Sequence, residues 1–285
     1  MSAPNDPLLV QTSDGLKLVG TRWAAGLDDT PPRALVMLVH GFGEHVGRYE
    51  HVAAHFNRAG YLLAGVDLRG HGRSPGRRGY TPSLDQMLDD LVAIKASIRA
   101  LHPSLPLFIY GHSMGGNLVL NFLLRRTPTL SGAIVTSPWL RLTKPPNAAL
   151  AGVVAVLNKV APRIPVPNKL EQGGLSRDPD VETRYNEDPL VHGLVTPRLF
   201  TEIRDGGEWA IEHAGELHVP TLLMHGEADP ITSCDGSRAF ASNAPSARLT
   251  FRPWPNLRHE THNEPEQAEV LDAMMAFVRT HGDAP

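Results

Sequence analysis

Short apolar segments recur along the first half of the chain, each bounded by turn-forming residues. Residues 34–39, 61–66, 105–110 and 132–137 are rich in apolar side chains, which is typical of strands buried on both faces of a parallel sheet. Residues 16–23 instead alternate between apolar and polar side chains, as an antiparallel strand with one exposed face does. The pattern therefore predicts a sheet that is mostly parallel.

Helical spacing separates these predicted strands. Residues 49–59 and 84–101 carry apolar side chains three and four positions apart, and Ser83 stands where the N-cap of the second helix belongs. An alternation of buried strands with such helices indicates the α/β class, in which helices cover both faces of the sheet.

The alternation is interrupted after residue 138. Residues 139–208 are crowded with prolines and have no regular apolar period. It then resumes, with strands predicted at 220–225 and 248–254 and helices at 235–243 and 265–281. We therefore predict a core built from residues 1–138 and 209–285, with residues 139–208 inserted as a cap.

Charge and composition exclude several classes of partner. The 285 residues include 27 Lys and Arg against 30 Asp and Glu, so the formal charge of −3 gives no general attraction to nucleic acid. No nucleic-acid partner is expected. A local cluster of Arg69, Arg73, Arg77 and Arg78 lies in a Gly- and Pro-rich segment, and we interpret it as a solvated loop.

The single cysteine, Cys234, rules out an intramolecular disulfide and a cysteine-based zinc site. Residues 1–10 have neither a basic start nor an apolar stretch, so no secretory signal is predicted. The longest apolar stretches are too short to span a bilayer. We expect a cytoplasmic protein of unspecified oligomeric state, whose contact with membranes is at most peripheral.

The pentapeptide GHSMG at residues 111–115 lies between a predicted strand and the helical segment 116–126. In this context the sharp strand-to-helix turn exposes the central serine at the carboxyl edge of the sheet, and the flanking glycines leave room for the neighbouring chain. The Met114 amide and the helix dipole then face a carbonyl oxygen that gains negative charge. The motif predicts Ser113 as nucleophile and Met114 as an oxyanion donor.

A serine hydroxyl needs a base to remove its proton, and the base needs an acid to orient it. In this type of fold the order along the chain is serine, acid, histidine. Asp229 follows the strand at 220–225, and His259 lies between the next strand and the last helix. They are the predicted acid and base. Competitors remain among the 14 histidines and the nearby acids: His262, His225 and His281 for the base, and Glu227 and Asp235 for the acid.

The second oxyanion donor is expected from the loop HGFGEH at residues 40–45, which follows the strand at 34–39. We predict that the Phe42 amide faces the oxyanion and that Gly41 and Gly43 allow this backbone to approach closely.

No metal or cofactor is expected. Residues 259–262 read HETH, but a zinc-protease motif requires two residues between the glutamate and the second histidine.

Taken together, five motifs resemble those of monoacylglycerol lipases and related lysophospholipases of the α/β-hydrolase fold. They are HGFGEH at 40–45, DLRGHGRS at 67–74, GHSMGG at 111–116, HGEAD at 225–229 and RHE at 258–260. The resemblance runs from about Leu35 to the C-terminus and is weakest across the cap. It implies a mostly parallel eight-stranded sheet flanked by helices, and hydrolysis of monoacylglycerols through an acyl-enzyme on Ser113.

The resemblance also implies where the substrate binds. It places the loop that carries Gly41, Glu44 and His45 near the polar end of the site; a surface role explains Glu44 as well as glycerol binding does. An apolar stretch of the cap that includes Leu150, Val153 and Val154 would then face an acyl chain or a lipid surface; ordinary packing explains this stretch equally well. Cys234 stands at a different offset from the acid than in some members, so thiol sensitivity is not implied.

Several alternatives stay open. Lysophospholipase and short- or medium-chain carboxylesterase activities are the nearest, and thioesterase or peptidase activity uses the same acyl-transfer machinery. A non-catalytic binding protein on the same scaffold is the alternative from another class, and it would be expected to lack one triad member. Dehalogenases and epoxide hydrolases carry an aspartate at the position of Ser113, so they are not favoured.

Overall fold

The computed structural model describes residues 6–24, 31–168 and 173–282. Its centre is an eight-stranded sheet with the strand order β1-β2-β4-β3-β5-β6-β9-β10. The strands are β1 (Asp6–Gln11), β2 (Lys17–Trp23), β3 (Ala34–Val39), β4 (Tyr61–Val66), β5 (Leu107–His112), β6 (Gly132–Thr136), β9 (Thr221–Gly226) and β10 (Leu249–Trp254). Only the pairings of β1 with β2 and β2 with β4 are antiparallel. The predicted α/β-hydrolase sheet is confirmed.

The two kinds of strand have the burial that their sequences predict. Every residue of β3, β4, β5, β6 and β9 is buried, because helices cover both faces of the sheet. The edge strand β1 was not predicted. Its segment is short, but Leu8 and Val10 are buried while Leu9 is 67% exposed, which is the period-two signal of a half-buried strand.

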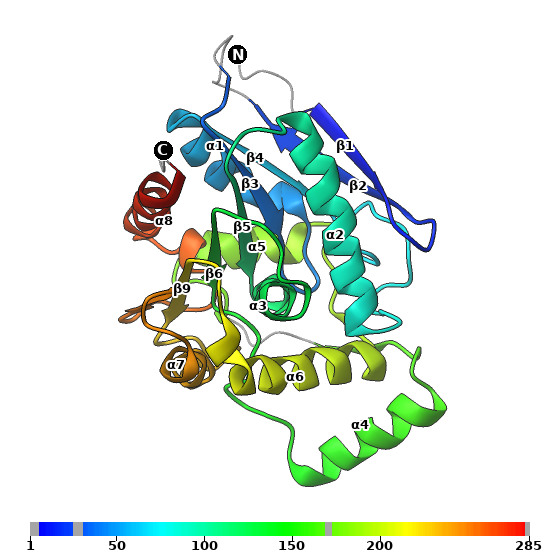
Figure 1. Cartoon of the computed structure of the whole chain (residues 1–285). Helices are drawn as coiled ribbons and strands as arrows, with labels where there is room; N and C mark the ends of the chain where they lie inside the picture. Colours follow the sequence, from blue (N-terminus) through cyan, green and yellow to red (C-terminus); the bar gives the residue numbers. More distant parts are fainter. Residues whose placement is uncertain (1–5, 25–30, 169–172, 283–285) are drawn as a thin grey trace.

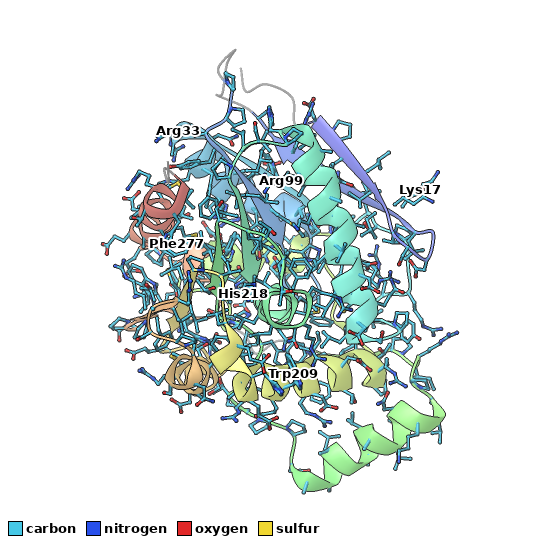
Figure 2. All side chains as sticks on the ribbon, viewed as in Figure 1. Lys17, Arg33, Arg99, Trp209, His218 and Phe277 are labelled. Carbon is cyan, nitrogen blue, oxygen red and sulfur yellow. The ribbon has the colours of Figure 1, made fainter. Side chains whose placement is uncertain are left out.

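Helices cover the sheet in two layers (Figure 1). On one face lie α1 (Glu50–Arg58) and α8 (Gln267–Gly282), packed against Val36 and Leu38 of β3. The other face packs through Leu35 and Met37. It carries α2 (Leu84–Leu101), α3 (Met114–Arg126), α6 (Pro197–Glu212) and α7 (Cys234–Asn243). Side chains fill the space between the layers, whereas Lys17 points outward (Figure 2). Alternate residues of one strand thus serve opposite cores.

Three short 3-10 helices join these elements: η1 (Val46–Tyr49), η2 (Ala214–Glu216) and η3 (Thr261–Asn263). Between β6 and β9 the chain also forms α4 (Ala148–Val160), α5 (Pro179–Glu187) and a small antiparallel pair, β7 (Val166–Pro167) with β8 (Leu194–Val195). No helix within the described ranges combines the length and apolarity needed to cross a membrane.

The predicted end of the cap at residue 208 falls inside α6. This helix buries Leu199, Ile203 and Ala210 in the main core, so it packs as a core helix that happens to follow the cap in sequence. By contrast, α4 projects from the body below α6 (Figure 1) and contains no buried residue. The helix α6, which straddles the predicted boundary at residue 208, therefore packs with the core along its length.

The prediction of a solvated arginine loop was wrong for Arg69. This side chain is only 5% exposed, and it forms ion pairs with Asp90 of α2 and with Asp14. The loop turns at Gly70. The φ of this residue is 72°, a backbone conformation that favours glycine. Two carboxylates then balance one buried guanidinium. Arg73 and Arg77 are exposed, as predicted.

Candidate active site

Ser113 occupies a strained turn between β5 and α3. Its φ of 54° and ψ of −118° are unfavourable for a residue with a side chain. A Cβ on Gly115 would lie 2.1 Å from the Val39 carbonyl oxygen, so this position requires glycine. The Ser113 amide donates to Thr136 O at 3.0 Å, and its carbonyl accepts from the Trp139 amide at 2.9 Å. These bonds hold the turn in place.

The three residues of the predicted triad meet at the carboxyl edge of the sheet. His259 Nε2 lies 2.9 Å from Ser113 Oγ, and His259 Nδ1 lies 2.8 Å from Asp229 Oδ2. The side chains come from the segments that follow β5, β9 and β10, and all three residues are buried. A base within hydrogen-bonding distance of the hydroxyl and oriented by a carboxylate can activate a serine nucleophile.

Charge couples His259 to Asp229. Burial by itself would lower the pKa of His259, but the charge of Asp229 and its hydrogen bond outweigh burial and raise this pKa above 6.5. Burial would raise the pKa of Asp229, but His259 and His225 hold it below its ordinary value. The pair therefore stabilises an imidazolium, which forms when His259 takes the serine proton.

The competing histidines lie elsewhere. His262 is buried and stacks on Tyr49, with ring centroids 5.0 Å apart, and burial lowers its pKa to about 3. His281 lies on α8 against Phe277. His225 contacts Asp229 and forms no hydrogen bond to the Ser113 hydroxyl among the described residues. Among the described residues, only His259 hydrogen-bonds to the Ser113 hydroxyl.

The competing acids are exposed. Glu227 and Asp235 both form ion pairs with Arg238 at the surface. Asp235 lies in the first turn of α7, whose N-cap is Ser233. The structure therefore leaves Asp229 as the acid that contacts His259.

Phe42 and Met114, the predicted oxyanion donors, both lie beside Ser113. Met114 begins α3 directly after Ser113, and Phe42 lines the same cavity as Ser113. The loop of Phe42 approaches closely, because a Cβ on Gly41 would lie 3.2 Å from Ser113 Cβ. Neither amide donates a hydrogen bond to any described residue. Both are free to donate to a substrate oxygen.

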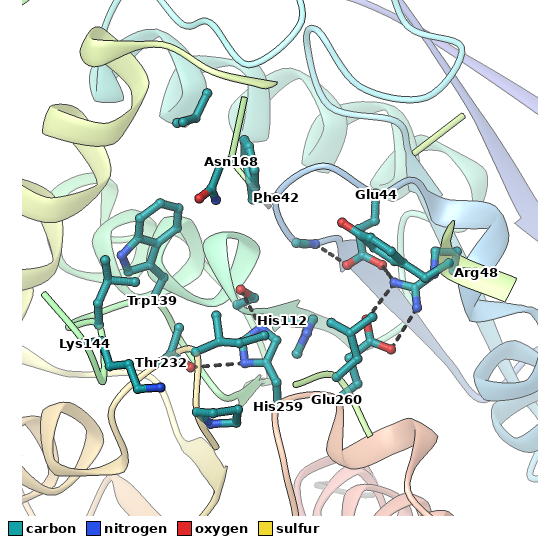
Figure 3. Close-up of a pocket in the computed structure, with 18 of the residues that line it drawn as sticks. Phe42, Glu44, Arg48, His112, Trp139, Lys144, Asn168, Thr232, His259 and Glu260 are labelled. Carbon is teal, nitrogen blue, oxygen red and sulfur yellow. Dashed lines mark hydrogen bonds and ion pairs between the residues drawn. The ribbon is translucent and has the colours of Figure 1, made fainter. Parts of the chain in front are cut away.

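A cavity of about 260 Å³ opens beside Ser113. Its apolar wall includes Phe42, Trp139, Leu142, Leu175, Val195, Phe200 and Ile231. Its polar wall includes Glu44, Arg48, Tyr185 and Glu260. Figure 3 shows Trp139 and Lys144 on one side of His259, with Glu44 and Arg48 on the other. The reacting groups thus stand between an apolar end and a polar end.

Sequence reasoning indicated Glu44 but missed the other two charges of the polar end, Arg48 and Glu260. Arg48 donates to Glu44 at 2.5 Å and binds both oxygens of Glu260, at 2.7 and 2.8 Å. Glu44 also accepts from the Gly41 amide and the Tyr49 hydroxyl. Arg48 follows the predicted loop and Glu260 follows the predicted base, so each lies close in sequence to a predicted site residue. Nothing in the sequence indicates that residues 212 positions apart pair.

The expected substrate-binding residues are only partly brought together. Gly41 and Glu44 line the cavity, but His45 does not. Its imidazole caps η1 and lies 2.8 Å from Asp188, so it joins the loop to the segment after α5. Both ring nitrogens of His45 are engaged by these contacts outside the cavity, through Asp188 and the Gly47 amide.

The cap residues Leu150, Val153 and Val154 do not line the cavity either. Leu150 and Val153 are 52% and 54% exposed, because α4 lies outside α6 with its apolar face uncovered. The structure therefore places Leu150 and Val153 at the surface and leaves Val154 partly buried, and none of the three lies beside an acyl chain in the cavity.

Comparison with known proteins places this geometry in a family. Residues 30–266 match the family described as serine aminopeptidase, S33. The chain belongs to the S33 family. Within it, the chain is 36% identical over 94% of both chains to a monoacylglycerol lipase of Mycolicibacterium smegmatis.

Solved structures of similar proteins share the fold over nearly the whole chain. A monoacylglycerol lipase of Paleococcus ferrophilus is 30% identical, with a TM-score of 0.81 over 98% of this chain and 100% of its own. A soluble variant of the monoglyceride lipase of Saccharomyces cerevisiae, in complex with a substrate analogue, is 25% identical, with a TM-score of 0.89 over 99% of this chain and 97% of its own.

The coupling of His259 to Asp229 predicts the pH dependence of this S33 protein. Only neutral His259 accepts the serine proton, so kcat/KM should fall with decreasing pH through a midpoint above 6.5. Asp229→Asn removes the charge that raises this pKa and leaves burial to lower it. The midpoint should therefore move below its wild-type value, and the plateau should fall by about 10⁴-fold. A pH profile on a soluble ester checks both effects.

Glu227→Gln is the matched control, since it removes an exposed competitor that contacts neither His259 nor Ser113. Its profile should coincide with that of the wild type. An Asp229→Asn profile with an unmoved midpoint and an intact plateau would show that Asp229 does not act on the base.

Proposed function

We propose that the chain is a serine esterase that hydrolyses monoacylglycerols to glycerol and a fatty acid. One observation carries the proposal: the hydrogen-bonded series Ser113, His259 and Asp229 lies on a cavity that has one apolar end and one polar end. A monoacylglycerol has the same division, with its ester bond between an acyl chain and a glycerol. The names of the relatives at 30% and 36% identity support the same substrate.

The geometry supports acyl transfer in two steps. Ser113 Oγ attacks the ester carbonyl carbon while His259 Nε2 takes its proton, and the Phe42 and Met114 amides donate to the oxyanion. The intermediate expels the glycerol oxygen, which receives the proton from His259. A water molecule then attacks the acyl-serine while His259 again takes a proton as base. The second tetrahedral intermediate collapses, which releases the fatty acid, and His259 returns the proton to Ser113 Oγ.

The charges of the polar end favour a neutral alcohol. Glu44 and Glu260 carry two negative charges and Arg48 carries one positive charge, so this buried cluster has a formal charge of −1. A phosphate group placed beside it is repelled in a medium of low dielectric. Glycerol instead offers hydroxyl groups to the carboxylate oxygens. The cluster therefore favours monoacylglycerol over lysophospholipid.

The same cluster disfavours aminopeptidase chemistry. An aminopeptidase must bind the ammonium group of its substrate, usually through an unpaired carboxylate. Within the described part of the chain, Glu44 and Glu260 are the two carboxylates that line the cavity, and both already bind Arg48. An ammonium group would meet the Arg48 guanidinium.

A matched substrate panel tests the function: 1-monoacylglycerol, lysophosphatidylcholine, triacylglycerol, a p-nitrophenyl ester and an amino-acid anilide. The highest kcat/KM is expected for monoacylglycerol. Ser113→Ala should lower it by roughly a millionfold, and Ser104→Ala, in an exposed turn, should leave it unchanged. Turnover confined to the p-nitrophenyl ester would reduce the function to a general esterase, and preference for the anilide would overturn the substrate class.

A second part of the proposal concerns lipid surfaces. The exposed face of α4 presents Leu150, Val153, Val156 and Val160, each at least 52% exposed. A helix with such an uncovered apolar stripe can lie in the interface of a membrane. We infer that α4 makes this peripheral contact and brings the cavity to its substrate.

Val153→Asp should therefore weaken cosedimentation with phosphatidylcholine vesicles by about tenfold, because it places a charge on the inserted face. Hydrolysis of monoacylglycerol held in vesicles should fall with it, whereas turnover of a soluble ester should not change. Ala155→Asp, on another face of the same helix, is the control and should bind vesicles normally. Equal binding by all three proteins would contradict the proposed contact.

A further inference from the structure

Asp229 has a second histidine at the oxygen that orients the base. Its Oδ2 lies 2.8 Å from His259 Nδ1 and 3.2 Å from His225 Nε2, and it also accepts from the Thr232 hydroxyl at 2.8 Å. The Asp229 Oδ1 atom accepts from the backbone amides of Ile231 and Thr232. The catalytic mechanism uses only the bond to His259, so the fully buried His225 has no part in it so far.

The partners of His225 fix its tautomer. Nε2 lies 3.1 Å from the carbonyl oxygen of Thr232, which can only accept, so Nε2 must carry a proton. That proton faces both Thr232 O and Asp229 Oδ2. Nδ1 lies 2.7 Å from the hydroxyl of the buried Ser237 of α7, which can donate to it. A ring held in this way presents its Nε2–H to the carboxylate.

The arrangement is nearly symmetric about Asp229. On one side the order is Asp229, His259 and Ser113, and on the other side it is Asp229, His225 and Ser237. Only the first serine lines the cavity. The second arm is therefore closed to substrate and can act only through the carboxylate.

We propose that His225, held by Ser237, is a positioning residue that fixes the Asp229 carboxylate and shares its Oδ2 with His259. Donors to one oxygen compete, because each draws on the same negative charge. The Nε2–H of His225 thus limits how strongly Asp229 stabilises the His259 imidazolium. His225 keeps the base ready to give up its proton to the leaving alcohol while preventing rotation of the carboxylate. This inference rests on the proposed hydrolase mechanism.

Other charged groups around His259 do not replace this contact. The titratable groups that interact electrostatically with the base or its carboxylate include Glu44 from the loop after β3, His112 at the end of β5, Glu260 and His262 after the base, and Cys234 at the start of α7. His262 stacks on Tyr49. Glu44 and Glu260 are paired with Arg48, and Cys234 hydrogen-bonds to no described residue of the triad. Among the described residues, His225 is the second imidazole in contact with Asp229.

The pH profile of kcat/KM separates positioning from a structural role. His225→Leu removes the competing donor, so Asp229 acts more strongly on His259, and the acid midpoint should move up by about half a pH unit. The plateau of kcat should fall by about tenfold with KM unchanged, because a bond that orients Asp229 is lost. His225→Gln keeps an N–H at the position of Nε2 and should restore both values to within about twofold of wild type. Ser242→Ala, on the same helix as Ser237, is a neutral control.

A loss of thermal stability with an unmoved midpoint would overturn the proposal, as would failure of His225→Gln to restore a folded enzyme. A second measurement applies even if His225→Leu does not fold. In the ¹⁵N-histidine NMR spectrum of the wild type, the signals that disappear in His225→Gln should belong to a ring that carries a proton on Nε2. Protonation at Nδ1 would contradict the assigned contact. This readout needs no substrate, so it stands apart from failure of the proposed function, which would appear as absent ester turnover.

Discussion

The strained backbone at Ser113 is the constraint on which the site depends. Holding a serine at φ 54° costs on the order of 1–3 kcal/mol, and the parallel sheet offsets that cost by fixing the turn through Thr136 and Trp139. The same turn starts α3 with its first amide uncommitted. Nucleophile and oxyanion donor are thus adjacent residues of one turn, and the fixed edge of the sheet brings Asp229 and His259 to meet them.

Two buried groups of charged side chains adjoin this turn and have different effects on the site. The Asp229 carboxylate gathers several donors at its two oxygens, so it stays ionised in a place that burial would otherwise make neutral. The cluster of Glu44, Arg48 and Glu260 keeps an excess negative charge beside the leaving-group side of the cavity. The first system sets the basicity of His259. We propose that the second favours neutral alcohols over anionic head groups.

The parts of this site that could be predicted from sequence are those set by local chain order. A strand, a glycine-flanked serine and a helix identify Ser113 and Met114, and the order of later strands selects Asp229 and His259. The pairing of Arg48 with Glu260 depends on two loops meeting in space, and no local pattern records that. The sequence offers His225 only as a rival base. Its contact with Asp229 forms in the turn after β9, and its contact with Ser237 forms only when α7 packs against β9.

The fold follows the same division. Buried central strands are mostly apolar and are predicted to within about two residues. The edge strand β1 has few buried positions, and α6 follows a proline-rich segment although it packs as a core helix. Arg69 looked like one more solvated charge, because its partners Asp14 and Asp90 lie far from it in sequence. In each case the structure depends on tertiary contacts that the local sequence does not indicate.

The central claim is that Ser113 is a nucleophile activated by His259. Intact-protein mass spectrometry after exposure to a fluorophosphonate, followed by peptide mapping, tests it most directly. We expect one adduct per chain, located on Ser113, and none in Ser113→Ala. Labelling that leaves Ser113 unmodified, or that persists in Ser113→Ala, would contradict it.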